Sequence, residues 1–258
     1  MFFNLLQFEH LKNFKEINHF ISTRSGGFSK GRYAELNLSF NVDDKPEYVI
    51  KNRKIVAKLL GISNAKLFFP NQCHTANIKI VDAKTSVSEL EETDALLCNT
   101  PTVGIGVLAA DCVPVIFFDK QKKVIGAAHA GWKGTVQLIA PKVVELMHIR
   151  FNSSPDDILI GIGPAISQEA YEIGSNVITA ISGLFIGADK FLKFKNQNTE
   201  HAFVDLQMLN MQLLINHGVP AANIEVLRKC TFQSPELFFS ARRDGFHCGR
   251  FGSVISII

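Results

Sequence analysis

Apolar residues in the middle of the chain form three continuous runs rather than an alternating pattern. These runs are "VGIGVLAA" (103–110), "VPVIFF" (113–118) and "KVIGAAHA" (123–130). Continuous apolar runs of this length are typical of strands that are buried on both faces. The polar segment "DKQK" (119–122) separates the last two runs. We therefore expect these two strands to form a hairpin.

Helical patterns occur at three places, residues 43–61, 135–149 and 204–218. Asp205 is placed to cap the third helix. Pro141 lies inside the second pattern, where it must kink the helix or begin it anew, because proline lacks the amide hydrogen that a helix interior uses.

Shorter strand candidates complete the pattern, and no linker rich in Pro, Gly or Ser divides the chain. The candidates are 66–70, 77–83, 157–163, 223–230 and 249–258. Because strands both follow one another and alternate with helices, we expect mixed rather than purely parallel sheets. The sequence thus predicts an α+β fold with mixed β-sheets flanked by helices, in a single domain over residues 1–258.

The hairpin predicts a pair of side chains with metal-binding chemistry. If residues 119–122 form a four-residue loop, Phe118 pairs with Lys123 and Cys112 lies opposite His129. Directly opposed residues share one face of a sheet, so a thiolate and an imidazole could reach the same metal ion. The alternative is that His129 is a hydrogen-bonded core residue.

A third ligand would favour the metal, and His74 in the polar loop "PNQCHTA" is the leading candidate. A catalytic zinc ion usually takes three protein ligands and keeps one position open. His247 in "FHCGR" is a less obvious possibility. The other five histidines are expected at the surface: His10, His19, His148, His201 and His217.

Other polar residues point to substrate binding. The arginines of "STRSGG" and "FFSARRDG", which are Arg24, Arg242 and Arg243, suit phosphate or carboxylate because the guanidinium group is a planar fork of donors. Lys133, next to Trp132, and Tyr171 are further candidates. Asp111 could orient a ligand histidine, or it could equally cap a turn. Solvated loops, ordinary ion pairs and a packing tryptophan are the alternatives.

Composition narrows the class of protein. The chain has 258 residues and a net charge of +3, with Lys and Arg scattered, so neither a nucleic-acid stripe nor a polybasic membrane patch is indicated. No run approaches the roughly 18 apolar residues of a membrane span. The N-terminus lacks the pattern of a secretory signal, and five cysteines without C-x-x-C spacing suggest free thiols in a reducing compartment. We expect a cytoplasmic protein, as a monomer or a small homo-oligomer.

Several ordered strings together carry a family resemblance. They are "STRSGGFS", "NQCH", "ADCVPVIFFD", "AAHAGWKGT", "GIGPAI…YEIG" and "CT…FFSARRDG…GR". In this order, from about Ser22 to the C-terminus, they resemble the YfiH-like family. This family has been labelled both multicopper polyphenol oxidoreductase (laccase) and purine nucleoside phosphorylase. This sequence departs from the family pattern at two places, Cys73 and the "FHC" segment. Neither departure changes a residue that the resemblance assigns to the metal site.

The resemblance implies a metal site and a chemistry. The metal ligands of the family fall on His74, Cys112 and His129, which would also be the catalytic centre. The implied activities are phosphorolysis of adenosine, inosine and S-methyl-5'-thioadenosine, with inorganic phosphate as co-substrate, and deamination of adenosine. Arg24, Lys133, Tyr171, Arg242 and Arg243 are the expected substrate-binding residues.

The choice of metal follows from the number and type of ligands. A multicopper oxidase needs about ten histidines by general knowledge of that class, whereas this chain has 8 His. A single blue copper needs a weak axial Met, and all four methionines, Met1, Met147, Met208 and Met211, lie outside the quoted strings. Zinc is therefore expected, with copper and polyphenol oxidation as the alternative.

Two further classes of function stay open. Cys112 and His129 could be a nucleophile pair of a cysteine hydrolase. The chain could also be an enzyme that edits peptidoglycan precursors, or a binding module without catalysis.

Overall fold

The three continuous apolar runs form neighbouring strands at the centre of the molecule, in a computed structural model that describes residues 3–195 and 198–258. They are β6 (Gly104–Ala109), β7 (Val113–Asp119) and β8 (Val124–Ala130), and every residue in them is buried. This burial on both faces explains why their sequence does not alternate between apolar and polar residues. β6 belongs to one sheet, whereas β7 and β8 belong to another.

The first sheet has five strands in the order β1-β2-β14-β6-β3. Besides β6 these are β1 (Leu5–Leu6), β2 (Ile17–Ser22), β14 (Phe251–Ile257) and β3 (Leu67–Phe68). The central strand β14 runs antiparallel to both neighbours, while β3 runs parallel to β6. The last residues of the chain therefore form an inner strand of this sheet.

The second sheet has six strands in the order β13-β9-β7-β8-β5-β4. Its other members are β13 (Ile224–Val226), β9 (Ile158–Ile162), β5 (Ala95–Cys98) and β4 (Ile78–Ile80). β7, β8, β9 and β5 pair antiparallel, whereas the outer strands β13 and β4 are parallel to their neighbours. Both large sheets are mixed, which confirms the predicted fold class.

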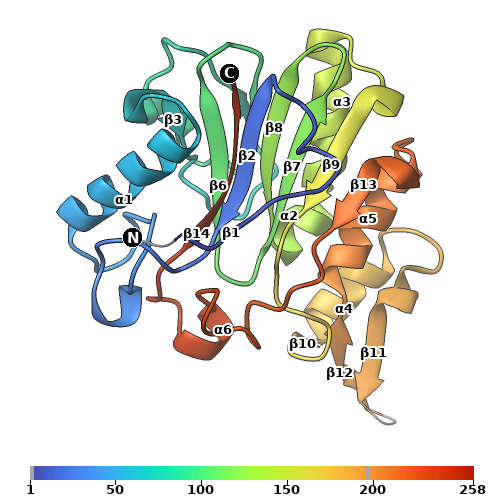
Figure 1. Cartoon of the computed structure of the whole chain (residues 1–258). Helices are drawn as coiled ribbons and strands as arrows, with labels where there is room; N and C mark the ends of the chain where they lie inside the picture. The colour runs from blue at the N-terminus through green and yellow to red at the C-terminus, as the bar shows by residue number, and fades with distance from the viewer. Residues whose placement is uncertain (1–2, 196–197) are drawn as a thin grey trace.

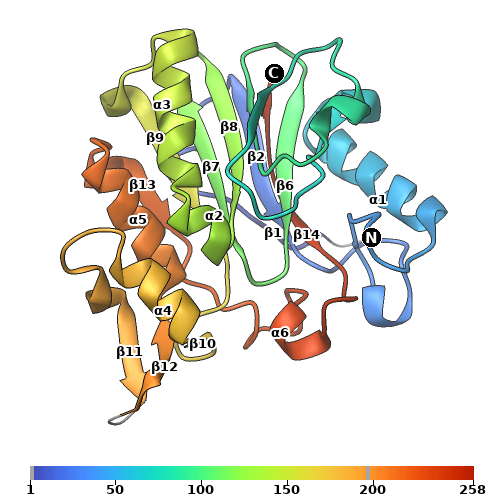
Figure 2. The same cartoon turned by 180° about the vertical axis from the view of Figure 1, so that it is seen from behind.

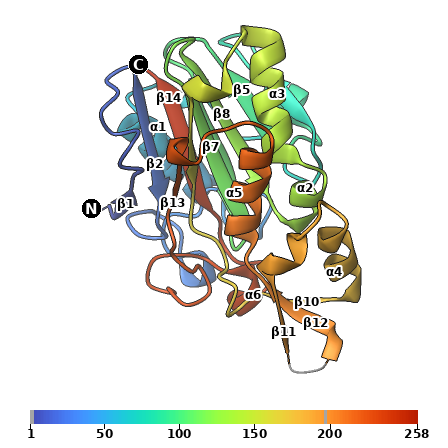
Figure 3. The same ribbon diagram turned by 90° about the vertical axis from the view of Figure 1, so that its right-hand side faces the viewer.

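The two sheets pack face to face and helices cover their outer faces, as Figures 1 and 3 show. Between the sheets lies one apolar core that includes Phe118, Ile105 and Ile255. The helix α1 (Pro46–Leu59) packs on the five-stranded sheet. The helices α3 (Ile139–Phe151) and α5 (Leu206–Asn216) pack on the six-stranded sheet, in front of it in Figure 2.

A smaller unit completes the molecule beside the six-stranded sheet (Figure 1). It is a three-stranded antiparallel sheet in the order β10-β12-β11, accompanied by the helix α4. The bounds are β10 (Glu172–Gly174), α4 (Ser175–Ser182), β11 (Leu192–Lys195) and β12 (Asn198–Val204). The sequence analysis did not predict these elements, nor β1, β2, β5 and the one-turn helix α6 (Ala241–Asp244).

The second predicted helix is two helices. α2 (Trp132–Val136) ends after little more than one turn, and α3 begins anew at Ile139 after Leu138, whose backbone is left-handed with φ of 63°. Pro141 therefore lies in the first turn of α3, where its missing amide hydrogen costs no hydrogen bond. The predicted restart is correct, and it occurs before the proline.

The hairpin forms, but its predicted register is wrong by two residues. Asp119 pairs with Val124, and His129 pairs with Pro114 rather than with Cys112. The turn shifts because the Asp119 side chain accepts hydrogen bonds from the amides of Gln121 and Lys122, at 2.8 and 2.9 Å. A shift of two residues leaves each side chain on the same face of the sheet.

One of the predicted surface histidines is in the core. His19 on β2 is 1% exposed, and its Nε2 accepts a hydrogen bond from the Phe8 amide at 3.0 Å. Among the described residues, no helix combines the length and the apolar character needed to cross a membrane.

Candidate metal centre

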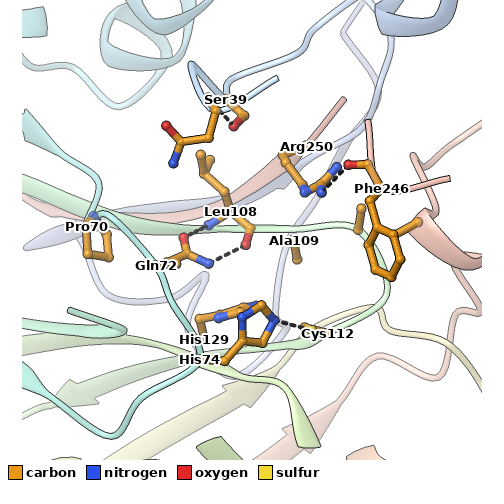
Figure 4. A pocket seen from close by; sticks show the side chains of 13 residues that line it. Ser39, Pro70, Gln72, His74, Leu108, Ala109, Cys112, His129, Phe246 and Arg250 are labelled. Atoms are coloured by element: carbon orange, nitrogen blue, oxygen red, sulfur yellow. Dashed lines mark hydrogen bonds between the residues drawn. The ribbon is translucent and has the colours of Figure 1, made fainter. Parts of the chain in front are cut away.

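His74, Cys112 and His129 meet at one end of the sheets, although they are far apart in the sequence. One ligand atom from each lies within 4.8 Å of the other two. The Cys112 Sγ is 3.9 Å from His74 Nε2, and the two imidazole rings meet edge to face with centroids 4.9 Å apart. Figure 4 shows the three side chains together at the side of a cavity. Among the described residues this is the one cluster of His, Cys, Asp and Glu with such spacing.

Each of the three residues comes from a different element. His129 is the penultimate residue of β8, and Cys112 lies in the short connection where the chain leaves β6 of one sheet and enters β7 of the other. His74 lies in the loop between β3 and β4, with a left-handed backbone of φ 65°. The site is therefore assembled where the two sheets meet.

Asp94, just before β5, contacts both imidazole-bearing segments. Its Oδ1 accepts a hydrogen bond from His129 Nδ1 at 2.9 Å, and the carboxylate also accepts the amides of Cys73, His74 and Thr75. Because an ionised carboxylate only accepts hydrogen bonds, His129 must carry a proton on Nδ1, and Nε2 is then the nitrogen available to the cluster. Asp94 does not stand out in the sequence, since an aspartate before an apolar run has many ordinary uses.

Without a metal ion, charge interactions within the protein favour the ionised forms of Cys112, His129 and Asp94. Burial raises the pKa of the Cys112 thiol, but His129 and His74 outweigh it and lower the pKa to about 6. Burial lowers the pKa of His129, but the Cys112 thiolate and Asp94 raise the pKa to about 9. Burial also raises the pKa of Asp94, but hydrogen bonds from His129 and Thr75 lower the pKa to about 2. The thiolate that a metal ion requires is thus favoured at neutral pH.

The hydrogen bonds of the Asp111 carboxylate go to the segment around α6 and not to a histidine of the site, so of its two predicted uses the orientation of a ligand histidine is not the one observed. Its carboxylate accepts hydrogen bonds from Thr231 Oγ1 at 2.6 Å, Ser240 Oγ at 3.0 Å and the Arg242 amide at 2.7 Å. Its own backbone is left-handed, with φ of 97°. These bonds hold the corner between the two sheets, and the corner presents Cys112.

Two cavities adjoin the cluster. The smaller encloses about 200 Å³ and reaches all three residues, with Gln72 and Arg250 among its other walls (Figure 4). The larger encloses about 580 Å³ and reaches His74 and Cys112. Both are also lined by Ala241 and Phe246, and the Phe246 side chain is 84% exposed at their rim. The cluster therefore lies between two adjoining spaces that are large enough for small molecules.

Three of the predicted substrate-binding residues line the larger cavity, namely Lys133, Tyr171 and Arg242. The Arg242 guanidinium lies 5.3 Å from the centre of the Tyr171 ring. Burial raises the pKa of Tyr171, so its phenol stays a hydrogen-bond donor at neutral pH. Trp132 lines the same cavity and packs partly on the core.

Arg24 and Arg243 line neither cavity. Arg24 donates hydrogen bonds to the carbonyls of Ala34 and Pro235, at 2.9 and 3.0 Å. Arg243 donates to the carbonyls of Thr231, Phe232 and Phe238 and pairs with Asp244 at 2.7 Å. The structure thus uses both guanidinium groups to hold loops together. His247 is also outside the cavities, where it lies 3.5 Å from the Asp43 carboxylate.

Sequence comparison identifies the family. The family model described as multi-copper polyphenol oxidoreductase laccase matches residues 18–258. The chain belongs to this family. Its other members include a protein of Bacteroides thetaiotaomicron named purine nucleoside phosphorylase, which is 34% identical over 98% of this chain and 96% of that protein. A protein of an unknown prokaryotic organism named adenosine deaminase RL5 is 32% identical over 95% of this chain and 96% of that protein.

Solved structures of family members have the same fold. The crystal structure of the hypothetical protein YfiH of Bacillus licheniformis superposes with a TM-score of 0.91 at 34% identity, covering 96% of this chain and 95% of that one. The YlmD structure from Geobacillus stearothermophilus gives a TM-score of 0.87 at 31% identity. The predicted resemblance to the YfiH-like family is confirmed, and family members carry the names of nucleoside enzymes as well as the laccase description.

Proposed function

We propose that this chain is a zinc-dependent purine nucleoside enzyme. Its reactions would be phosphorolysis of adenosine, inosine and S-methyl-5'-thioadenosine, and deamination of adenosine. The observation that supports this most is the cluster of His74, Cys112 and His129 between two cavities, in a chain that matches a purine nucleoside phosphorylase over 98% of its length.

The ligand set fits zinc better than copper. Two imidazoles and a thiolate are ordinary zinc ligands, and three of them leave the open position of a catalytic site. A blue copper site of this composition adds a weak axial ligand, which is a methionine, a glutamine or a backbone oxygen. The side-chain oxygen of Gln72, which lines the smaller cavity, accepts a hydrogen bond from the Leu108 amide. No methionine lines either cavity, and Met147, Met208 and Met211 pack in or against the core. Met1 lies outside the described residues.

The chain's own residues prepare the site for this chemistry. When bound, zinc supplies Lewis acidity that makes a water molecule nucleophilic near neutral pH. Asp94 holds His129 in the tautomer that can bind a metal ion, and Asp111 holds the corner that carries Cys112. Tyr171, whose pKa is raised by burial, offers a neutral donor to a substrate in the larger cavity.

We place the phosphate co-substrate in the larger cavity, because Lys133 and Arg242 line it. Among the ion pairs of the described residues, neither cation has an acidic partner. Asp111 also lines this cavity, but its carboxylate is engaged by three donors. An anion at this wall would therefore meet two cations whose charge is not already neutralised, and Trp132 and Phe246 would offer aromatic faces to a purine.

A cysteine hydrolase is the second candidate, and one observation favours it. The site contains the three groups of a catalytic triad. Cys112 would be the nucleophile, His129 the base, and Asp94 the acid that orients the base. In a hydrolase of this kind the thiol would work without any metal ion.

Metal analysis of the untagged protein tests the proposal. We expect about one zinc per chain, and loss of that zinc in the variants Cys112→Ala and His74→Ala. Stoichiometric copper together with oxidation of phenols would instead indicate a laccase. A metal-free protein that loses its activity when Cys112 is alkylated would indicate the hydrolase.

A further inference from the structure

Asp94 has an unusual number of hydrogen-bond donors around one side chain. The carboxylate is fully buried and accepts five of them, from His129, Cys73, His74 and both the amide and the hydroxyl of Thr75. The distances run from 2.8 to 3.1 Å. An ionised carboxylate offers about four lone-pair sites, so its accepting capacity is used in full.

The Asp94 carboxylate bridges two segments of the chain. Oδ1 accepts from His129 Nδ1 and from the His74 amide, whereas Oδ2 accepts from the Cys73 amide and from both groups of Thr75. His129 lies at the end of β8, whereas Cys73, His74 and Thr75 lie in the loop between β3 and β4, so Oδ1 contacts both segments and Oδ2 contacts the loop. One side chain therefore joins a rigid strand to a loop that has no ladder hydrogen bonds of its own at these three residues.

The loop needs such an anchor. His74 is exposed, and its left-handed backbone is one that histidine seldom adopts without help from its surroundings. Three consecutive amides that converge on one carboxylate provide this help. A free loop would not hold the His74 imidazole at 3.9 Å from the Cys112 thiol.

We propose that Asp94 is the positioning residue that couples the two imidazole ligands of the site. It fixes which nitrogen of His129 faces the cluster. It also holds the Cys73–Thr75 loop so that the His74 imidazole lies beside His129 and Cys112. This inference rests on the proposed function for the identity of the metal, but the loop anchor itself involves only the protein. An asparagine cannot replace the carboxylate. Its side-chain NH2 group would face hydrogen-bond donors, and this group cannot accept their hydrogen bonds.

The test compares three variants with the wild type in two measurements. Asp94→Asn removes the coupling, and Asp82→Asn is the matched control. Thr75→Val removes the bond from the hydroxyl to Asp94, together with the bonds of that hydroxyl to the Asn77 amide and the Glu92 carbonyl. Asp82 is a loop carboxylate that also accepts a backbone amide, from Lys84, but it is exposed and lines neither cavity. Zinc affinity is measured by competition with a chromophoric chelator, and hydrogen–deuterium exchange of residues 73–75 is measured in the metal-free protein.

We expect zinc to bind about 10- to 100-fold more weakly to Asp94→Asn, as is usual when the carboxylate partner of a metal-bound histidine is lost. The amides of residues 73–75 should exchange at least about tenfold faster in this variant, because they lose their acceptor. Thr75→Val should show a smaller change in the same direction in both measurements. Asp82→Asn should match the wild type.

Zinc affinity within about threefold of the wild type in a folded Asp94→Asn protein, with unchanged exchange of the loop, would overturn the inference. If Asp94→Asn does not fold, Thr75→Val decides, and an unchanged loop and unchanged affinity there would overturn it. A wild-type protein that binds no zinc would contradict the proposed function instead. The exchange of the loop amides would then still decide whether Asp94 is their anchor.

Discussion

Gly131 leaves the space that the Cys112 thiol occupies. A Cβ atom at residue 131 would lie 2.8 Å from Cys112 Sγ and 3.1 Å from His74 Cδ2. The backbone of Gly131 has φ of −64°, which any residue adopts, so its conformation does not require glycine. The side chains of the site are therefore what excludes a larger residue here.

The variant Gly131→Ala should accordingly keep the fold and damage the site. We expect the added methyl group to displace Cys112 and His74 and to lower zinc affinity by about tenfold or more, because metal ligands tolerate only small errors in position. Gly183→Ala is a suitable control, since its nearest contact would be an ordinary 3.5 Å. Unchanged zinc affinity in Gly131→Ala would show that the thiol does not bind where the structure has it.

The two cations of the larger cavity should separate the two proposed reactions. Lys133→Ala and Arg242→Ala are each expected to lower kcat/KM for phosphate by about tenfold or more, because charge-assisted hydrogen bonds to the anion are lost. Adenosine deamination needs no phosphate, so it should change by less than about threefold. The control is Lys123→Ala, whose side chain pairs with Glu16 at the hairpin turn and lines neither cavity. Equal losses in both reactions would argue against a phosphate site at this wall.

The Cys112 thiol should react at a lower pH than an ordinary cysteine once the metal has been removed by a chelator. Burial raises its pKa, but His129 and His74 lower the pKa to about 6, so half of it is thiolate near pH 6. The rate of alkylation by iodoacetamide, followed by mass spectrometry, should therefore level off above about pH 7. In His129→Gln the midpoint should move up by one unit or more.

Cys73 serves as the internal reference in that experiment. Cys73 is exposed to solvent, but partial desolvation of its thiol and the negative charge of Asp94 raise its pKa. The rate of its alkylation should therefore keep rising above pH 9. A midpoint at Cys112 that matches that of Cys73 would contradict the electrostatic account of the site.

His19 should make the protein less stable in mild acid. Burial lowers its pKa to about 4, whereas the unfolded chain titrates near 6.5. Above about pH 6.5 the residue is neutral in both states and its full contribution is present. Below that, the unfolded state binds the proton first, so the free energy of unfolding falls by about 1.4 kcal/mol per pH unit until about pH 4, or by about 3 kcal/mol in total.

Urea unfolding at several pH values between 7 and 4.5 measures this dependence. The variant His19→Gln, which can still accept the hydrogen bond from the Phe8 amide, should show a flatter dependence on pH than the wild type. Parallel curves for the two proteins would mean that His19 has the same pKa in the folded and the unfolded state, which would contradict the effect of burial.

The sequence predicts what depends on local pattern. The buried strands β6, β7 and β8 are recognisable because both of their faces are covered, and the α5 helix because Asp205 caps it by accepting the Met208 amide at 3.0 Å. Cys112 and His129 also stand out, because polar groups are rare among small apolar residues, whereas His74 is a candidate because it lies in a polar loop between strands. The hairpin register fails by two residues, since a side-chain interaction of Asp119 decides where the turn begins.

What the sequence does not predict depends on contacts between distant segments. Asp94 becomes important only when the loop of His74 and the end of β8 meet around it, 20 and 35 positions away in the chain. Asp111 could accept from a histidine or cap a turn on sequence grounds, and it binds Thr231 and Ser240 from a segment 120 and 129 positions away. Arg24 and Arg243 lie in the same kind of arginine- and glycine-containing segment as Arg242. Their guanidinium groups, however, donate hydrogen bonds to backbone carbonyls and line neither cavity.

The central claim is that the cluster of His74, Cys112 and His129 acts on purine nucleosides. The most direct test incubates the zinc-loaded protein with adenosine, with and without inorganic phosphate, and separates adenine, inosine and hypoxanthine by chromatography. We predict adenine only in the presence of phosphate, inosine in both cases, and neither product with His129→Ala. An unchanged product trace for His129→Ala, or adenosine left intact by the zinc-loaded wild type, would contradict the account.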